Sequence, residues 1–138
     1  MTTPFILPIR VYYEDTDAGG VVYHANYLHF FERARTEMLR DLGFEHTKLR
    51  TEYGVIFAVK NIICDFIRPA KLDDFLHAST EIKQVKKASL IFEQTLQRDE
   101  ITLCTARCQI VCLNTDTFLP TAIPDFLLKQ FLTKSNEH

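Results

Sequence analysis

The order of hydrophobic and polar positions predicts a strand, two helices, four further strands and a final helix. Residues 5–14 are rich in apolar, β-branched and aromatic side chains, and Pro4 and Pro8 place the start of this first strand at a sheet edge or an irregular entry to the sheet. Helical spacing begins near Ala25 and stops at Gly43, which predicts a helix of about five turns. The apolar face of this helix consists of Tyr27, Phe31, Ala34, Met38 and Leu42. A shorter helix is predicted over residues 45–53.

The second half of the chain alternates apolar and polar residues in long β-like runs. These runs cover residues 55–68, 75–85, 89–98 and 101–113. The connections between the last three are short, which favours antiparallel hairpins. Pro124 then occupies the first turn of a C-terminal helix with an apolar stripe. The predicted fold class is therefore α+β, with one long helix packed on a curved antiparallel sheet of about five strands. The absence of a βαβ pattern argues against most dinucleotide-binding and phosphotransfer folds.

Composition and charge narrow the class of protein further. The chain has 138 residues, 46% hydrophobic and 25% charged, which is typical of one globular domain spanning residues 1–138. Lys and Arg number 16 against 18 Asp and Glu, so we expect no nucleic-acid partner. No window has the apolar length of a transmembrane segment, and we expect a cytoplasmic protein. A sheet around a single helix leaves apolar edges that self-association would bury.

Four cysteines raise the question of a metal site or disulfide. Cys104, Cys108 and Cys112 share a four-residue spacing, and Cys64 lies apart. On one strand the three would face the same way, but neighbours would be ~13 Å apart, too far for a disulfide or a shared metal. We expect small buried core side chains in a reducing compartment, and no metal site.

The segment between the first strand and the long helix holds the densest set of reactive side chains. It contains Asp15 and Asp17, then Gly19, Gly20 and His24. A calcium loop would need ligands where the chain has a glycine and an asparagine, so that match fails. An aspartyl-phosphate site would need a parallel sheet that the pattern does not predict. The third interpretation is a carboxylate that acts on a carbonyl held by the free N–H groups of a helix N-terminus. Each residue also has a structural interpretation, as a turn cap, a helix start or a core side chain.

Residues 10–35 resemble the active-site signature of the 4-hydroxybenzoyl-CoA thioesterase family, and most closely its acyl-CoA thioesterase branch associated with the bacterial Tol-Pal system. The similarity continues through FFERARTEMLR, through Arg68, Pro69 and Ala70, and to the region of Leu119–Pro124, so it covers nearly the whole chain. Membership implies the hotdog fold, in which an antiparallel sheet wraps a long helix. The hydrophobic pattern favours the same arrangement independently.

The resemblance also implies roles for individual residues. Asp17 corresponds to the catalytic aspartate, acting as nucleophile or as general base for water. His24 stands where the family offers a backbone N–H to the thioester carbonyl, and its imidazole is expected to assist. Tyr13 belongs to the same catalytic set, whereas Asp15 is expected to be structural. The positions assigned to substrate binding are Gly19, Gly20 and Val21.

The activity implied is hydrolysis of acyl-CoA, without cofactor, by a homotetramer built as a dimer of dimers with active sites at subunit interfaces. A thiol leaving group with a pKa near ~8.5 needs little protonation, so one carboxylate and an oxyanion site suffice. The alternative is a scaffold that holds acyl carrier protein or phospholipid-synthesis enzymes. A peripheral position at the inner membrane is left open. A third alternative, a hotdog dehydratase, fits the motif less well. Lys86 and Lys87, at a predicted turn, either contact coenzyme A phosphates or are simply solvated.

Overall fold

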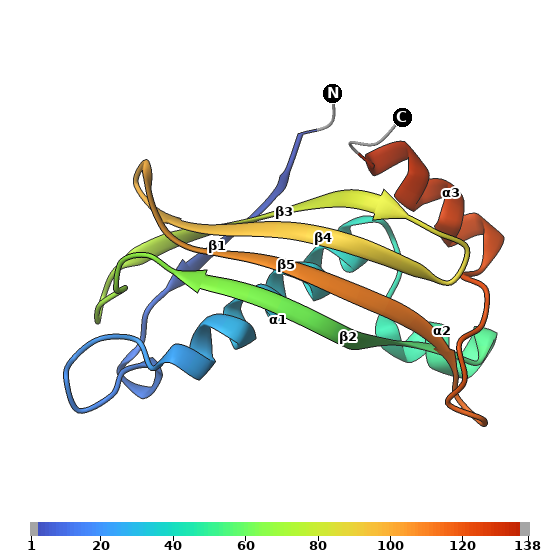
Figure 1. Cartoon of the computed structure of the whole chain (residues 1–138), viewed down its shortest axis with the longest axis horizontal. Coiled ribbons are helices and arrows are strands. Elements are labelled where there is room, and N and C mark those ends of the chain that lie inside the picture. The colour runs from blue at the N-terminus through green and yellow to red at the C-terminus, as the bar shows by residue number, and fades with distance from the viewer. Residues whose placement is uncertain (1–2, 136–138) are drawn as a thin grey trace.

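The computed structural model describes residues 3–135, which form one antiparallel sheet, three α-helices and a short 3-10 helix (Figure 1). The strands are β1 (Phe5–Arg10), β2 (Val55–Phe66), β3 (Phe75–Val85), β4 (Ser89–Arg98) and β5 (Ile101–Asn114). The helices are α1 (His24–Asp41), α2 (His46–Tyr53) and α3 (Asp125–Lys134), and the 3-10 helix is η1 (Tyr13–Asp15). None of the helices within residues 3–135 is long and apolar enough to cross a membrane.

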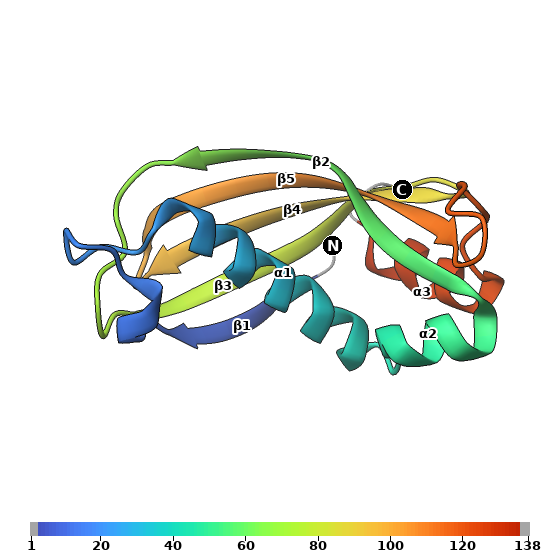
Figure 2. The ribbon, with the colours of Figure 1, turned by 90° about the horizontal axis from the view of Figure 1, so that it is seen from below.

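The strand order is β1-β3-β4-β5-β2, so β1 and β2 form the two edges of the sheet. Every neighbouring pair is antiparallel. The sheet curves around α1, which crosses its inner face (Figure 2). The predicted α+β class and the hotdog arrangement of a wrapped helix are therefore confirmed.

The alternation predicted from the sequence explains how the core is formed. On β4, Leu90, Phe92, Gln94 and Leu96 are buried beneath α1, while the residues between them are only partly buried. The core has two clusters, one around the first half of α1 and one where its second half meets α2 and α3. The two halves of α1 therefore pack into different hydrophobic clusters.

The cysteines are core residues, as expected. Cys104, Cys108 and Cys112 are buried along the inner side of β5, and all four cysteines are free. The sequence did not indicate that Cys64, on β2, would lie with its Sγ 3.3 Å from Sγ of Cys104. Burial raises the pKa of both thiols, which keeps them protonated.

The predicted boundaries hold closely except at the first strand. The expectation of a strand over residues 5–14 is wrong beyond Arg10, because the chain turns into η1 instead. Asp15 closes this turn by accepting the backbone N–H of Tyr12 at 2.8 Å. The two tyrosines there have high β-propensity, which a hydrogen bond within the turn overrides. Pro124 also lies one position earlier than expected, as the N-cap of α3 rather than in its first turn.

Candidate active site

The loop of residues 16–23, hereafter the site loop, joins η1 to α1 and carries Asp17. Its backbone is folded tightly, because the N–H of Asp17 donates to the carbonyl of Val21 at 2.9 Å and the N–H of Gly20 donates to the carbonyl of Asp17 at 3.0 Å. Gly20 has a φ of 79°, which favours glycine. Oδ1 of Asp17 accepts the N–H of Gly19 at 2.8 Å. The loop therefore presents an exposed carboxylate in a defined orientation.

Asp15 has the structural role expected of it. Its side chain is buried, and its Oδ2 and Oδ1 accept the N–H of Tyr12 at 2.8 Å and Nδ2 of Asn26 at 3.1 Å. Its carbonyl accepts the N–H of Tyr23 at 3.0 Å. One residue thus ties η1, the end of the site loop and the first turn of α1 together, whereas Asp17 is exposed to solvent.

The N-terminus of α1 is open to a ligand. Tyr23 is the N-cap but provides no side-chain hydrogen bond, and no acidic residue lies in the first turn. The N–H of Asn26 is occupied by the carbonyl of Tyr23 at 2.8 Å. The N–H groups of His24 and Ala25 have no intrahelical partner and carry partial positive charge. A carbonyl oxygen placed there would be polarised, and a negative charge developing on it would be stabilised.

An aromatic wall stands beside this helix end. The ring of His24 lies 4.5 Å from the ring of Tyr23 and 6.4 Å, edge-on, from Phe66 at the end of β2. Tyr27 lies 5.3 Å from Phe66 in turn. Sequence reasoning missed Phe66, since only the sheet topology brings the end of β2 to the start of α1. The site thus combines a carboxylate, free N–H groups, an imidazole and an apolar wall.

Residue Ala70, in the connection after β2, anchors the site loop. Its carbonyl accepts the N–H of Val22 at 2.8 Å, and its own N–H donates to the hydroxyl of Tyr27 at 3.0 Å. Burial raises the pKa of Tyr27; the Ala70 bond opposes this, and the negative charge of Asp17 adds to it. The hydroxyl therefore stays protonated and keeps the loop attached to α1.

The structure brings most of the expected residues together, but not all of them. Asp17, Gly19, Gly20, Val21 and His24 lie along the site loop and the first residue of α1. Tyr13 is instead on η1, with 82% of its surface exposed. Its hydroxyl forms no hydrogen bond within residues 3–135, so a contact between Tyr13 and Asp17 stays a prediction.

The chain is similar in sequence to known thioesterases. The sequence model of the thioesterase-like superfamily matches residues 11–131. The chain belongs to this superfamily. It is 51% identical over 120 residues to the acyl-CoA thioesterase YbgC of Haemophilus influenzae, an alignment that covers 87% of this chain and 88% of that protein. It is 46% identical over 131 residues to the acyl-CoA thioester hydrolase YbgC of Escherichia coli O157:H7, with 94% and 97% covered.

A solved structure agrees with the sequence relatives. A probable thioesterase from Bartonella henselae superposes with a TM-score of 0.85 at 39% identity, over 88% of this chain and 100% of that one. The family resemblance carried by residues 10–35 is therefore confirmed.

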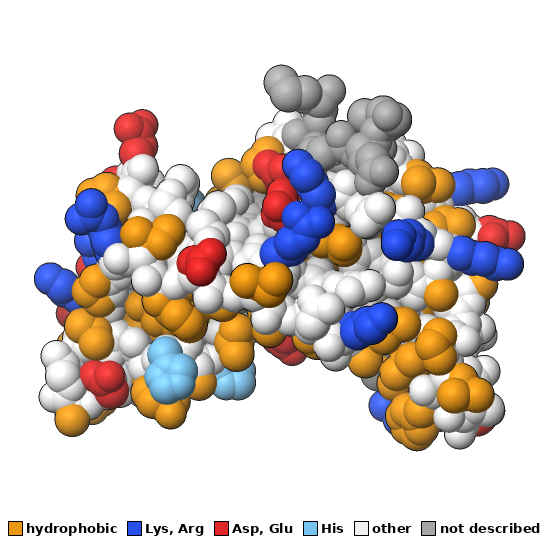
Figure 3. All heavy atoms as spheres, viewed as in Figure 1, with side chains coloured by type: hydrophobic (Ala, Val, Ile, Leu, Met, Phe, Trp, Pro, Cys, Tyr) orange, Lys and Arg blue, Asp and Glu red, His pale blue; other side chains and the backbone are white. Residues whose placement is uncertain are grey.

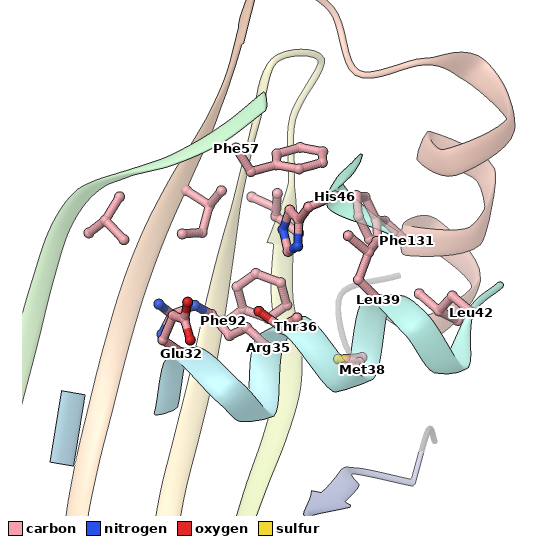
Figure 4. A pocket seen from close by; sticks show the side chains of 13 residues that line it. Glu32, Arg35, Thr36, Met38, Leu39, Leu42, His46, Phe57, Phe92 and Phe131 are labelled. Carbon is pink, nitrogen blue, oxygen red and sulfur yellow. The ribbon is translucent and has the colours of Figure 1, made fainter. Parts of the chain in front are cut away.

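The thioesterase chain also has an apolar cavity of about 420 Å³ under the second half of α1 (Figure 4). Its walls are mostly aliphatic and aromatic, and the polar side chains of Glu32, Arg35, Thr36 and His46 lie along its border. Figure 4 shows the ring of His46 directed into the cavity. Arg35 donates to Oε1 of Gln94 at 3.0 Å, which holds the guanidinium in place. The lining comes from six elements far apart in the sequence, which is why the sequence pattern did not reveal the cavity.

Lys86 and Lys87 lie in the turn between β3 and β4, as expected. This turn is at the end of the sheet opposite the site loop (Figure 1). Within one chain, the position of Lys86 and Lys87 therefore does not support the contact with coenzyme A phosphates considered above. Among the described residues, no group of three His, Cys, Asp or Glu side chains is placed to hold a metal ion.

Proposed function

We propose that this thioesterase hydrolyses acyl-CoA, with Asp17 as the catalytic carboxylate and the first-turn N–H groups of α1 as the oxyanion site. The observation that carries the proposal is the continuity of the site loop, which holds an exposed carboxylate and leads directly into an uncapped helix N-terminus. The names of the relatives from Haemophilus influenzae and Escherichia coli support the same substrate class.

The geometry supports a short reaction sequence. The thioester carbonyl accepts hydrogen bonds from the N–H groups of His24 and Ala25. Asp17 takes a proton from water, and the water oxygen adds to the carbonyl carbon. The resulting oxyanion collapses, the C–S bond breaks, and coenzyme A leaves as a thiolate that then takes up a proton. Direct attack by Asp17 would instead give an anhydride, which water opens to the same products. The imidazole of His24 provides a further donor beside the oxyanion.

The apolar cavity is the best candidate for the acyl group. Glu32, at its border, is eight residues after His24, which corresponds to about 12 Å along a helix. The volume and the apolar lining are those of a small-molecule site. An acyl chain whose carbonyl lies at His24 would extend along α1 toward this space.

We propose a homodimer formed through β2 as the basic assembly, and the expected homotetramer as a pair of such dimers. β2 is a sheet edge of 12 residues, with unpaired backbone groups along it. Its exposed apolar side chains include Val59, Ile63 and Phe66. A long apolar edge of this kind is an aggregation hazard unless a partner covers it. A cytoplasmic location remains part of this proposal.

The experiment measures thiol release from short-chain, long-chain and aromatic acyl-CoA esters, together with binding of coenzyme A and of acyl carrier protein. We expect one substrate class to be hydrolysed, and Asp17→Asn to lower kcat by about 10²–10⁴-fold while coenzyme A still binds. Binding of acyl carrier protein without hydrolysis of any ester would favour the scaffold and contradict the proposal.

A further inference from the structure

The connection between β5 and α3 displays two large apolar side chains to solvent. Phe118 and Leu119, at the tip of residues 114–120 (hereafter the tip loop), are 61% and 64% exposed. Phe118 has a φ of 57°, in the left-handed region that bulky residues rarely adopt. A phenylalanine held there, with its ring in water, is unfavourable for an isolated chain.

The tip loop is nevertheless firmly built. Oδ1 of Asn114 accepts the N–H groups of Asp116 at 2.8 Å and Thr117 at 3.1 Å. The carbonyl of Asn114 accepts the N–H of Phe118 at 2.8 Å, and Oγ1 of Thr117 accepts the N–H of Leu119 at 3.2 Å. These bonds fix the tip in one shape, so the two apolar side chains are presented rigidly.

The tip loop and the active site lie at opposite ends of β2. Thr115 donates its N–H to the carbonyl of Gly54 at 2.9 Å, which holds the tip loop beside the start of β2. Phe66, at the other end of β2, packs against His24. Figure 3 shows apolar side chains gathered at both ends of the lower border of the molecule.

The edge strand β2 is suited to pair with a second copy of itself, because few of its residues are charged. Lys60 and Asp65 are the charged residues of β2, and neither forms an ion pair within residues 3–135. Antiparallel pairing about a two-fold axis near the middle of β2 sets the first half of each strand beside the second half of the other strand.

This pairing determines where the tip loop lies. It places Gly54, just before the start of β2, near Phe66 of the second copy, from which that chain continues to Lys71. Lys71 is paired through its backbone with Val21 of the site loop. The tip loop, attached to Gly54, thus comes over the site loop of the second copy.

We propose that Phe118 and Leu119 of one copy form a wall of the acyl-CoA site in the other, facing Tyr23, His24 and Phe66. This inference rests on the proposed function and deepens it, because it makes the two side chains determinants of substrate binding supplied across the dimer. The contact buries the two exposed apolar side chains, and it places an apolar surface opposite the aromatic wall beside the oxyanion site. Apolar parts of the substrate are then held between the two copies.

The test uses the double variant Phe118→Asn with Leu119→Ser, called here the tip variant. Asparagine adopts the left-handed backbone readily, so this variant should fold at least as well as the wild type. We expect KM for apolar acyl-CoA esters to rise by about ten-fold or more. The matched control is Leu132→Ser, which removes an exposed apolar side chain from α3 and should leave KM unchanged.

Complementation shows which copy supplies the wall. A heterodimer with one tip-variant chain and one Asp17→Asn chain has one site that combines an intact Asp17 with an intact tip loop. At substrate concentrations well below KM, we expect this site to give about half the wild-type rate per dimer, well above either parent variant. An unchanged KM in the tip variant, a heterodimer no more active than its parents, or a fully active monomer would each overturn the inference. Retained activity in the Asp17→Asn homodimer would instead contradict the proposed function, so the two failures are distinguishable.

Discussion

The N–H of Gly19 donates a 2.8 Å hydrogen bond to Oδ1 of Asp17, and this contact orients the proposed catalytic carboxylate. A Cβ at residue 19 would lie 3.2 Å from the same oxygen, so Gly19→Ala pushes the carboxylate away. We expect kcat to fall by about 10–100-fold, since small displacements of reacting groups are costly. Kinetics and thermal unfolding of Gly19→Ala, with Ala18→Ser as the loop control, check this. Equal losses in both variants would show that the loop, and not the contact, was damaged.

Asp15 and Asp17 should respond oppositely to the same substitution. Both side-chain oxygens of Asp15 accept a hydrogen bond, and Asp15→Asn replaces one of them with an NH2 group that faces a donor. We therefore expect a loss of about 1–3 kcal/mol in the free energy of unfolding. Asp17→Asn leaves a solvent-exposed position, so we expect near-normal stability and little turnover. Denaturant unfolding and thiol release on both variants compare the two directly. Normal stability of Asp15→Asn would contradict its structural role.

Tyr27→Phe should weaken the attachment of the site loop to α1, because it removes the hydroxyl that accepts the N–H of Ala70. The substitution leaves the N–H of Ala70 without its partner, and we expect a loss of about 1–3 kcal/mol in the free energy of unfolding near neutral pH. Chemical denaturation of the variant measures this loss. A variant as stable as the wild type would show that water replaces the hydroxyl without cost.

The same tyrosine gives the wild type a pH dependence. Because burial raises the pKa of Tyr27 in the folded state, the unfolded chain ionises first once the pH exceeds about 10. The unfolded state then binds fewer protons, so the tyrosine's contribution to stability is complete below that pH and is lost as the pH rises further. We expect the free energy of unfolding to fall more steeply with alkaline pH in the wild type than in Tyr27→Phe. Parallel curves for the two proteins would contradict the assignment.

The cavity should set the acyl-chain preference. Leu42→Trp reduces its volume, and Phe57→Leu enlarges it. We expect the first variant to lower kcat/KM for the longest accepted acyl-CoA by about ten-fold, and the second to extend the accepted length. Rates across a chain-length series measure this. Unchanged profiles in both variants would place the acyl group elsewhere.

Local pattern was sufficient to predict the strands that form hairpins. β3 and β4 begin and end where the alternation of residues 75–85 and 89–98 indicated, because short turns and one buried face fix their register. The first strand was extended too far because the carboxylate of Asp15, rather than the propensity of its neighbours, decides the turn at Tyr12. Local hydrogen bonds of this kind are not visible in a hydrophobic pattern.

The candidate site could be proposed from the sequence only where its residues are close together along the chain. Asp17, Gly19 and His24 fall within one loop and one helix start, so spacing and family resemblance were enough to single them out. Phe66 and Ala70 reach the same site through the sheet topology, and the cavity is assembled from six elements. No spacing rule brings such residues together before the fold is known.

Asp17 is the residue on which the proposed thioester hydrolysis depends. The most direct measurement is the rate of thiol release from the preferred acyl-CoA by Asp17→Asn, with its assembly state, stability and coenzyme A binding verified on the same sample. We expect an intact, ligand-binding protein whose turnover is lost. Wild-type turnover by that intact variant would contradict this proposal.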